Sequence, residues 1–387
     1  MLTTLRNPKL LKLYVIPLIS NLTGSMTWAI SVIYALDLGA SILQVNLIST
    51  VWSTMSILVV VPFGILSDRL GRKPMLIVPT ILTILGSTMR SLATDPNHLL
   101  IAAFVGALSS DFFTVLISMV ADVAEPEEQR ESISTLLLFS SIGMVMGPLL
   151  GSFILTLPQM TLRNLYQMDV VVQTCVLLYV IVKVSETKTE AKSEKVEYRT
   201  HLSDLVNKPN FRLMLVMASF FFYFFSTMNT YVPICGRIVL GLSDSQVSTL
   251  ATFRGLAIMF IRFSVATFLN KVPARPFLIS TLALGGMTAL VTPIANSYIT
   301  LTGITFLYGV SFGATMVLGY TLVTSDSTPS SRGTANAIYS VFQSIGSLAV
   351  VFTSSLAETV GLAPVFLIGG VAALLSIIPI FLRKTRS

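Results

Sequence analysis

One charged stretch decides the fold of this protein, and it reads Gly64-Ile65-Leu66-Ser67-Asp68-Arg69-Leu70-Gly71-Arg72-Lys73. It lies between two apolar runs, at about 43–66 and 75–93, and leaves room only for a tight turn between them. Gly71 can supply the positive φ that a short turn needs, and Gly64 allows another helix to approach closely. Because lysines and arginines collect in the cytoplasmic loops of membrane proteins, the stretch predicts a cytoplasmic turn between two membrane helices.

Composition extends this prediction to the whole chain. Of the 387 residues, 53% are hydrophobic and 11% are charged, with a mean hydropathy of +0.81, whereas a soluble domain carries about 25% charged residues. Charges this few cannot cover a water-facing surface, so lipid must surround most of the chain. At about 20 apolar residues per span, we expect an all-α membrane protein of about twelve transmembrane helices. The apolar runs lie at about 11–36, 43–66, 75–93, 98–121, 132–157, 168–184, 211–235, 245–269, 276–295, 299–323, 334–357 and 363–382.

The net charge of +7 is explained by topology. Most of the 25 lysines and arginines lie in alternate turns, in the segment 185–208 and near the two ends of the chain. We therefore expect both termini and this segment to be cytoplasmic, in the plasma membrane of a prokaryote (the inner membrane). No nucleic-acid partner is expected, and the two cysteines, Cys175 and Cys235, fall inside apolar runs where they are expected to be packing residues.

The chain repeats itself. Residues 67–74 align with residues 269–276 at a shift of 202, which places Arg69 on Lys271 and Pro74 on Pro276. Duplicated halves with a binding site near the membrane centre are a recurring plan among transporters. The predicted organisation is an N-terminal six-helix bundle over 1–184, a linker over 185–208 and a C-terminal six-helix bundle over 209–387.

The stretch at 64–73 resembles the signature loop of the major facilitator superfamily, G-x-L-x-D-R-x-G-R-[RK]. The resemblance covers the whole chain and implies that superfamily's fold, with two pseudo-symmetric six-helix bundles that alternate access to a central cavity. It also implies that the loop acts as a gate latch, with Asp122 as the expected partner of Arg72; the alternative is a simple topology anchor. The expected gating residues are Gly64, Asp68, Arg69, Gly71, Arg72, Lys73, Asp122 and Arg130.

A second motif occupies the fifth apolar run. Gly143, Gly147, Pro148 and Gly151 resemble the antiporter motif of the same superfamily, G-x8-G-x3-G-P-x2-G-G, although serines replace two of its glycines at 134 and 152. Proline bends a helix and small residues four apart let another helix approach. The resemblance therefore implies the drug:proton antiporter branch and a bent, tightly packed helix; the alternative is a generic packing face of small residues.

Asp111 is the predicted proton-coupling residue. It lies about midway between His98 and Asp122, near the centre of the membrane, and we expect it to be the one acidic residue deep in any span. A carboxyl at this depth is costly unless it is neutral, paired or hydrated, which suits a group that carries a proton. The alternative is a carboxyl with a structural hydrogen bond.

Arg254 is the predicted centre of a substrate site, because it lies near the middle of the eighth run and deep arginines rarely face lipid. An anion, Asp111 or a helix end could each be its partner. Further polar or amphipathic candidates for the substrate cavity are Asn21, Trp28, Asn229, Tyr231, Asn336, Tyr339 and Gln343.

The chain contains no G-x-x-x-x-G-K-[ST], no H-E-x-x-H and no Cys/His cluster, so we expect neither an enzyme nor a bound cofactor or metal. The predicted function is proton-coupled export of small amphipathic compounds by a secondary active transporter, acting as a monomer. One alternative is transport of an organic anion, whether proton-coupled or facilitated. Another is a receptor or scaffold that retains the fold without transport, and amphipathic lipid stays open as a substrate.

Overall fold

In the computed structural model of this chain, the described residues are 7–109, 112–125, 128–187, 207–268, 272–325 and 332–383, and all their regular elements are helices. Eleven segments are long and apolar enough to cross a membrane, and one of them, Pro96–Val123, includes residues 110 and 111 outside the described ranges. The helix α4 (Pro74–Ser91) lies between two of these segments and completes the twelve predicted spans. The predicted fold class, an all-α protein with twelve membrane helices, is confirmed.

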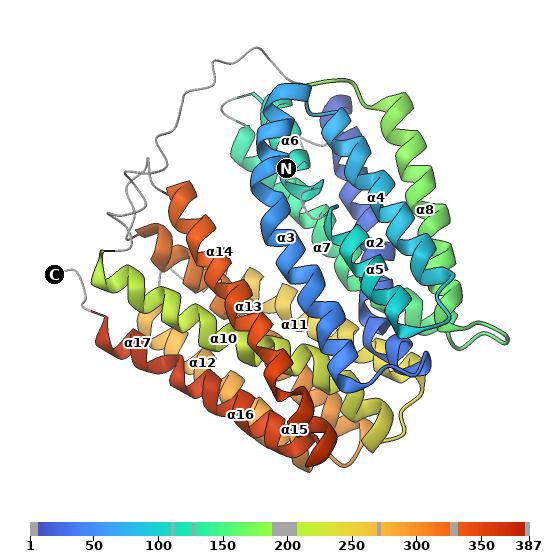
Figure 1. Ribbon diagram of the computed structural model, residues 1–387. Coiled ribbons are helices and arrows are strands. Elements are labelled where there is room, and N and C mark those ends of the chain that lie inside the picture. The colour runs from blue at the N-terminus through green and yellow to red at the C-terminus, as the bar shows by residue number, and fades with distance from the viewer. Residues whose placement is uncertain are drawn as a thin grey trace. The chain divides into compact units, whose positions relative to one another are not determined.

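The chain forms two compact units (Figure 1). The first comprises Met1–Ser193 and Ser243–Thr252, and the second comprises Glu194–Leu242 and Phe253–Ser387. The helices of the first unit are α2 (Pro8–Asp37), α3 (Ile42–Leu70), α4, α5 (Pro96–Ala107), α6 (Phe112–Val123), α7 (Gln129–Ile154) and α8 (Leu162–Lys183), together with the start of α11 (Asp244–Phe268).

The helices of the second unit follow the same plan. They are α10 (Pro209–Ile234) with the π-helix η1 (Cys235–Val239), the rest of α11, α12 (Ala274–Val291) with η2 (Thr292–Ile294), α13 (Tyr298–Ser325), α14 (Arg332–Leu348) with η4 (Ala349–Thr353), α15 (Ser354–Thr359), α16 (Leu362–Leu375) and α17 (Ile377–Leu382).

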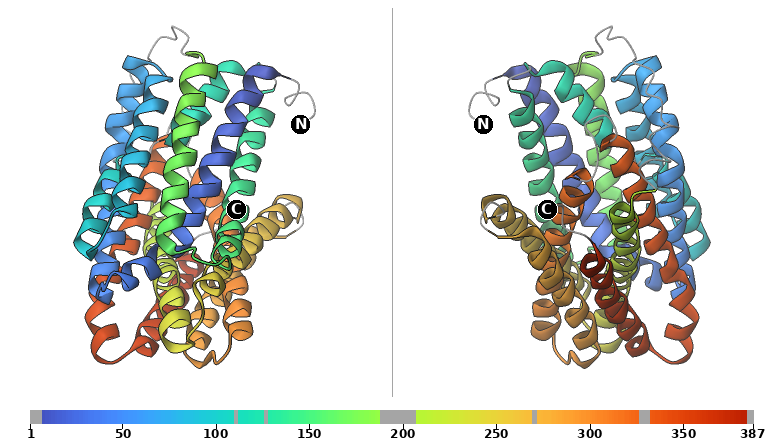
Figure 2. Two further views of the ribbon diagram at one scale, coloured as in Figure 1. Left: turned by 90° about the vertical axis from the view of Figure 1, so that its right-hand side faces the viewer. Right: turned by 90° about the vertical axis from the view of Figure 1, so that its left-hand side faces the viewer.

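Helix pairing is the same in the two units. In the first, α2 packs against α7 and α8, and α4 packs against α8 (Figure 2). In the second, α10 packs against α14 and α16, and α12 packs against α16. The pair α2–α7 therefore corresponds to the pair α10–α14, and the repeat that the signature loop indicated extends to the packing of the helices.

Two glycines mark this correspondence at the level of atoms. A Cβ added at Gly143 of α7 would overlap the carbonyl oxygen of Leu18 in α2. A Cβ added at Gly346 of α14 would overlap the carbonyl oxygen of Ser219 in α10. In both units a glycine therefore lets two helix backbones touch, which is how membrane helices gain packing energy without a hydrophobic driving force between them.

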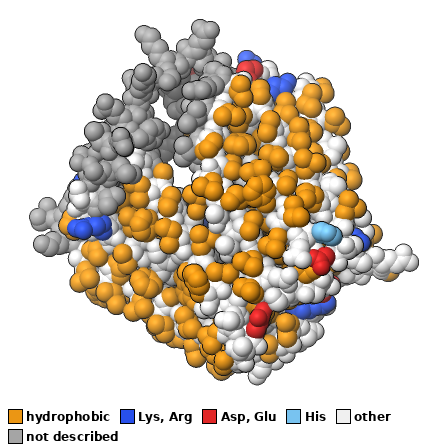
Figure 3. Space-filling view, viewed as in Figure 1, with side chains coloured by type: hydrophobic (Ala, Val, Ile, Leu, Met, Phe, Trp, Pro, Cys, Tyr) orange, Lys and Arg blue, Asp and Glu red, His pale blue; other side chains and the backbone are white. Residues whose placement is uncertain are grey.

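The surface of each unit is apolar where it would meet lipid. In the first unit Val171 is 63% exposed, and in the second Phe263 and Ile299 are 76% and 80% exposed. On the side of the first unit that Figure 3 shows, hydrophobic side chains cover the middle and the charged side chains lie near the helix ends. Hydrocarbon rather than water is the solvent that such a surface requires.

One boundary differs from the expected one. The sixth span was predicted to begin at 168, but α8 begins at Leu162. The side chain of Asn164 accepts a hydrogen bond from Thr161 N at 2.8 Å, which caps the new first turn, and Arg163 donates to Ala93 O at 2.8 Å. Polar residues that look like a loop by hydropathy therefore form the start of the helix, and residues after them lie deeper than expected.

Candidate functional site

The signature loop is a tight turn held by a carboxylate from a distant part of the chain. The helix α3 ends at Leu70, and Gly71 follows with φ +102°. Glu186, just after α8, accepts hydrogen bonds from the backbone amides of Arg72 and Lys73 at 2.9 and 3.0 Å. A Cβ at Gly71 would lie 2.6 Å from Glu186 Oε2. The backbone conformation therefore favours glycine here, and a Cβ would also make the carboxylate that caps the turn shift.

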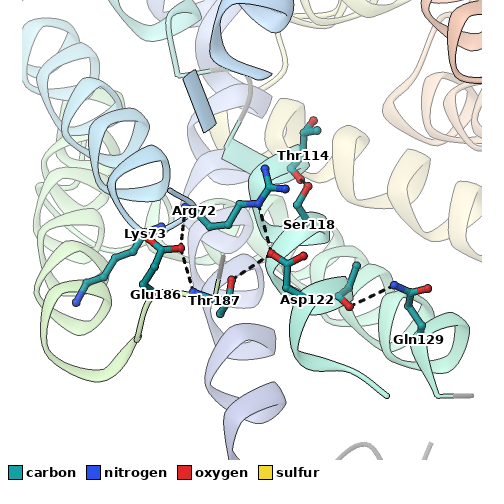
Figure 4. Close-up of polar contacts among 9 residues, drawn as sticks. Arg72, Lys73, Thr114, Ser118, Asp122, Gln129, Glu186 and Thr187 are labelled. Atoms are coloured by element: carbon teal, nitrogen blue, oxygen red, sulfur yellow. Dashed lines mark hydrogen bonds and ion pairs between the residues drawn. The ribbon is translucent and has the colours of Figure 1, made fainter. Parts of the chain in front are cut away.

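The structure places Arg72 beside Asp122 of α6 (Figure 4). Arg72 Nε lies 3.4 Å from Asp122 Oδ2, and the hydroxyl of Thr187 donates to the same oxygen at 3.4 Å. The two charged side chains are 20% and 22% exposed, so water weakens the pair without abolishing it. Lys73 Nζ donates to Ile181 O of α8 at 2.8 Å. The loop therefore ties together three helices, α3, α6 and α8, through contacts that a rearrangement of the helix ends would break.

Several predicted gating residues are placed only by their helices. Gly64, Asp68 and Arg69 lie in α3 and Arg130 lies in the first turn of α7, while the surroundings of these four residues are outside the described part of the structure. Asp111, the predicted proton carrier, lies outside the described residues altogether.

The second motif forms the contact between α7 and α2. A Cβ at Gly147 would overlap Leu22 O and Ser25 Oγ, and Ser25 Oγ donates to Gly143 O at 3.2 Å. Next to this contact Asn21, a predicted cavity residue, donates to Ser140 Oγ at 2.8 Å. The glycines of the motif thus hold α2 and α7 at backbone contact.

The end of the motif meets the start of α11 within the first unit. Ser152, which replaces a glycine of the pattern, is hydrogen-bonded to Ser245 Oγ at 2.9 Å and to Thr249 Oγ1 at 2.6 Å. Ser248 donates to Pro148 O at 2.9 Å. Where the pattern has a glycine that would let two helix backbones approach closely, Ser152 instead joins α7 to α11 through its hydroxyl group.

In the second unit, Arg254 of α11 has neutral neighbours. Its guanidinium donates a hydrogen bond to Asn229 Oδ1 of α10, and it interacts with Tyr308 of α13, which is 1% exposed. Among the described residues of this unit the one acidic residue is Glu358, which is exposed in α15. The structure thus brings two predicted cavity residues, Arg254 and Asn229, together and surrounds a deep cation with dipoles rather than with a carboxylate.

The other predicted cavity residues divide into two groups. Tyr231 is fully buried against Phe366, at 6.3 Å between ring centroids, and Trp28 in the first unit is 47% exposed. Tyr339 and Gln343 both meet Tyr320: the two tyrosine rings lie 5.2 Å apart and the Tyr320 hydroxyl donates to Gln343 Oε1 at 3.3 Å. On the same helix, Asn336 Oδ1 is buried with no hydrogen-bond partner among the described residues.

Sequence reasoning missed a buried carboxylate. Asp169 of α8 is 2% exposed and accepts hydrogen bonds from Ser87 Oγ at 2.5 Å and from Gln173 Nε2 at 3.3 Å. The expectation that Asp111 is the one deep acidic residue is therefore wrong. The predicted start at 168 placed Asp169 at the membrane surface, whereas α8 begins at Leu162 and carries it inside. A Thr-x-x-Asn capping pattern at 161–164 was the available signal.

Known proteins resemble this chain in sequence and in fold. The family model described as Major Facilitator Superfamily matches residues 13–351 and 239–387. The chain belongs to the major facilitator superfamily. Among solved superfamily structures, a mutant of the nucleoside transporter NupG matches with a TM-score of 0.80 at 11% identity, over 97% of this chain and all of that one. A bacterial homologue of the human lysosomal transporter Spinster, inward-facing and unoccupied, matches with a TM-score of 0.71 at 16% identity, over 97% and 96%.

Relatives by sequence include proteins named for multidrug resistance. The multidrug resistance protein MdtL of Shigella dysenteriae serotype 1 is 24% identical over 289 residues, which are 73% of each chain. The multidrug resistance protein MdtH of Photorhabdus laumondii is 36% identical over 93 residues, which are 24% of this chain and 23% of that one. With its superfamily established, this protein is a multi-pass membrane transporter rather than an enzyme, and small molecules are what it binds.

Proposed function

We propose that this protein exports small amphipathic compounds in exchange for protons, by alternating access, in the prokaryotic inner membrane. The observation that carries the proposal is the backbone contact of α2 and α7 at Gly143 and Gly147, because it gives the antiporter-like motif a physical form. The names of the relatives MdtL and MdtH support the same class of substrate. Cytoplasmic termini, a monomer and domain boundaries at 184 and 208 complete the proposal.

The gate assigned to this cycle is the signature loop. The Arg72–Asp122 pair and the Glu186 cap are partly exposed, so each can open at modest cost when the helix ends separate. Contacts that exist in one conformation and not in another are what biases a two-state transporter.

Asp111 is proposed to carry the coupled proton, and its replacement tests this. In proteoliposomes with a pH dye inside and an imposed proton gradient, we expect cationic or neutral amphipathic compounds to trigger proton movement. Asp111→Asn is expected to abolish it, because an amide does not titrate. Proton-driven transport that survives Asp111→Asn would show that this residue does not carry the coupled proton. If no compound triggers proton movement in the wild type, that result would count against proton exchange itself.

Transport of an organic anion is the second candidate, favoured by the neutral surroundings of Arg254. A deep cation without a carboxylate partner is stabilised when an anion arrives. We expect Arg254→Gln to raise the KM for an anionic compound about tenfold or more, the value of a lost charge-assisted hydrogen bond. Arg262→Gln, which removes an exposed arginine of the same helix, is the matched control. Equal effects of the two substitutions on anion transport would contradict an anion site at Arg254.

A receptor or scaffold without transport activity is the remaining class. It would be supported if reconstituted protein moved no compound of the cationic, neutral and anionic panel while still binding one of them with measurable affinity.

A further inference from the structure

The network around Asp169 joins three helices of the first unit. Asp169 and Gln173 lie one turn apart on α8, Ser87 lies on α4, and Ser20 and Thr23 lie on α2. Asp169, Ser87 and Gln173 are at most 4% exposed. Buried polar groups in a membrane protein are costly and must be satisfied inside the protein, so such a cluster marks a functional site by default.

The amide of Gln173 has more acceptors than it can serve. Its Nε2 lies 3.3 Å from Asp169 Oδ1, 3.3 Å from Ser20 O and 3.2 Å from Thr23 Oγ1. A primary amide has two N–H donors, so these three acceptors compete for two hydrogens. The carboxylate on α8 therefore competes with two acceptors on α2 for the same amide.

The titratable and charged groups around the cluster are one arginine and two neutral tyrosines. They are Arg90 on α4, Tyr34 on α2 and Tyr166 on α8. Arg90 interacts electrostatically with Asp169, but its guanidinium lies over the ring of Trp52, 5.7 Å from the centroid, and donates to Ala102 O at 3.3 Å. Arg90 thus offsets the negative charge from a distance without forming an ion pair with Asp169, which leaves both carboxylate oxygens to the hydrogen-bond network.

We propose that Asp169 binds and releases a proton during the transport cycle, and that Gln173 passes the change to α2. When Asp169 is ionised, it accepts from Ser87 and Gln173, as observed. When it takes up a proton, its new O–H donates to Ser87 Oγ, whose own hydrogen turns to a backbone carbonyl one turn earlier. A neutral carboxyl is a weaker acceptor than a carboxylate, so the Gln173 amide is released to its two acceptors on α2.

The helix α2 can transmit this change because its other face carries the contact with α7. Asn21 and Ser25 hold α7, while Ser20 and Thr23, within the same two turns, hold Gln173. Protonation at α8 thereby alters the hydrogen bonds on one side of the helix whose opposite side forms the contact between α2 and α7. Since interfaces between packed helices have discrete arrangements, a change of this size can select between them.

A proton fits this site better than a metal cation does. Ser87 and Asp169 form a short hydrogen bond of 2.5 Å that leaves no space between them. A metal cation would have to break this hydrogen bond and would lie near the positive charge of Arg90. A proton adds no volume and needs no further ligands.

The first test rests on the proposed function and separates coupling from binding. In proteoliposomes, Asp169→Asn is expected to lower proton-gradient-driven accumulation of substrate by about tenfold or more, a usual size for coupled sites. Exchange of substrate without a gradient is expected to persist. Asp37→Asn, which removes an exposed carboxyl at the end of α2, is the control and should drive accumulation as the wild type does. Undiminished gradient-driven accumulation in Asp169→Asn would overturn the proposal, and so would a sodium gradient that drives transport in the wild type but not in this variant.

The second test begins with a spectroscopic measurement that needs no substrate and therefore stands even if the proposed function fails. Infrared difference spectra of purified protein between acidic and alkaline pH are expected to show the band of a buried protonated carboxyl. The part of this band that comes from Asp169 should be missing from Asp169→Asn and present in Asp37→Asn and Gln173→Met, while a contribution from Asp111 would remain in all of them. Gln173→Met is expected to keep the band but lose gradient-driven accumulation, because it removes the amide that joins Asp169 to α2. Identical spectra of the wild type and Asp169→Asn would show that Asp169 does not titrate and would overturn the proposal.

Discussion

Gly147→Ala is expected to lower the stability of the folded protein markedly. The added methyl group would overlap Leu22 O and Ser25 Oγ of α2, and the first of these is a backbone atom that no side-chain rotation can move. Overpacking of this kind costs about 1–3 kcal/mol and sometimes more. Against a total stability of about 5–15 kcal/mol, we expect a marked fall in the thermal unfolding temperature and in the yield of monodisperse protein.

The control for this prediction is Gly24→Ala in α2, where an added Cβ meets nothing within 4 Å. Alanine is the better helix former by about 1 kcal/mol, so this variant should unfold at the same temperature as the wild type or higher. Gly346→Ala repeats the experiment in the second unit, where the Cβ would overlap Ser219 O. If Gly147→Ala and Gly24→Ala unfold alike, α2 and α7 are not held at backbone contact.

Arg90→Met is expected to lower the free energy of unfolding by about 1–3 kcal/mol, because the buried carboxylate of Asp169 loses the nearby positive charge that offsets its own. Arg90 fills a slot whose walls are Gly86 and Gly106, and a Cβ at Gly106 would lie 3.0 Å from its guanidinium. Its electrostatic partner across the helices is Asp169. Methionine keeps much of the volume and removes the charge, so unfolding in mixed micelles should report the electrostatic loss.

A second substitution tests the cause. Adding Asp169→Asn to Arg90→Met should recover a part of the lost stability, because no buried charge is then left over, and the double-mutant cycle measures the coupling of the two residues. Arg212→Met, at an exposed position in the first turn of α10, should change stability by less than about 0.5 kcal/mol. Strictly additive effects of Arg90→Met and Asp169→Asn would mean that Arg90 stabilises the protein only through its contacts with Trp52 and Ala102, and not through Asp169.

At the signature loop, the sequence predicted the turn and one ion-pair partner but not the carboxylate that caps the turn. The residues at 64–73 predicted a tight turn, and Gly71 has the expected positive φ of 102°. The partner Asp122 could be named, because it closes the helix before a neighbouring loop on the same side. Glu186 could not be named, because a glutamate at the start of a polar segment looks like any solvated residue until α8 ends beside the turn.

Among the deep polar residues, sequence reasoning found one cluster and missed another. Arg254 could be proposed for a substrate site from its depth, and Asn229 as a polar candidate for the same cavity; the structure places the two in hydrogen-bond contact. Asp169 was missed because hydropathy averages over a window, and the polar residues at 161–167 moved the expected start of the helix past it. The depth of a residue near a span end depends on capping, which is a property of single side chains rather than of an average.

What the sequence by itself determined is the class of the protein: twelve membrane helices, two repeated halves, a signature loop and a glycine-proline helix. These features are local or periodic, so they survive without knowledge of contacts. What only the tertiary structure decided is which polar groups meet: Glu186 with the amides of the turn, Gly346 with Ser219, and Asp169 with Ser87 and Gln173. Most of these pairings join residues far apart in the chain, and hydrogen bonds of that kind are selected by the packing of helices in a medium that offers no water as a substitute partner.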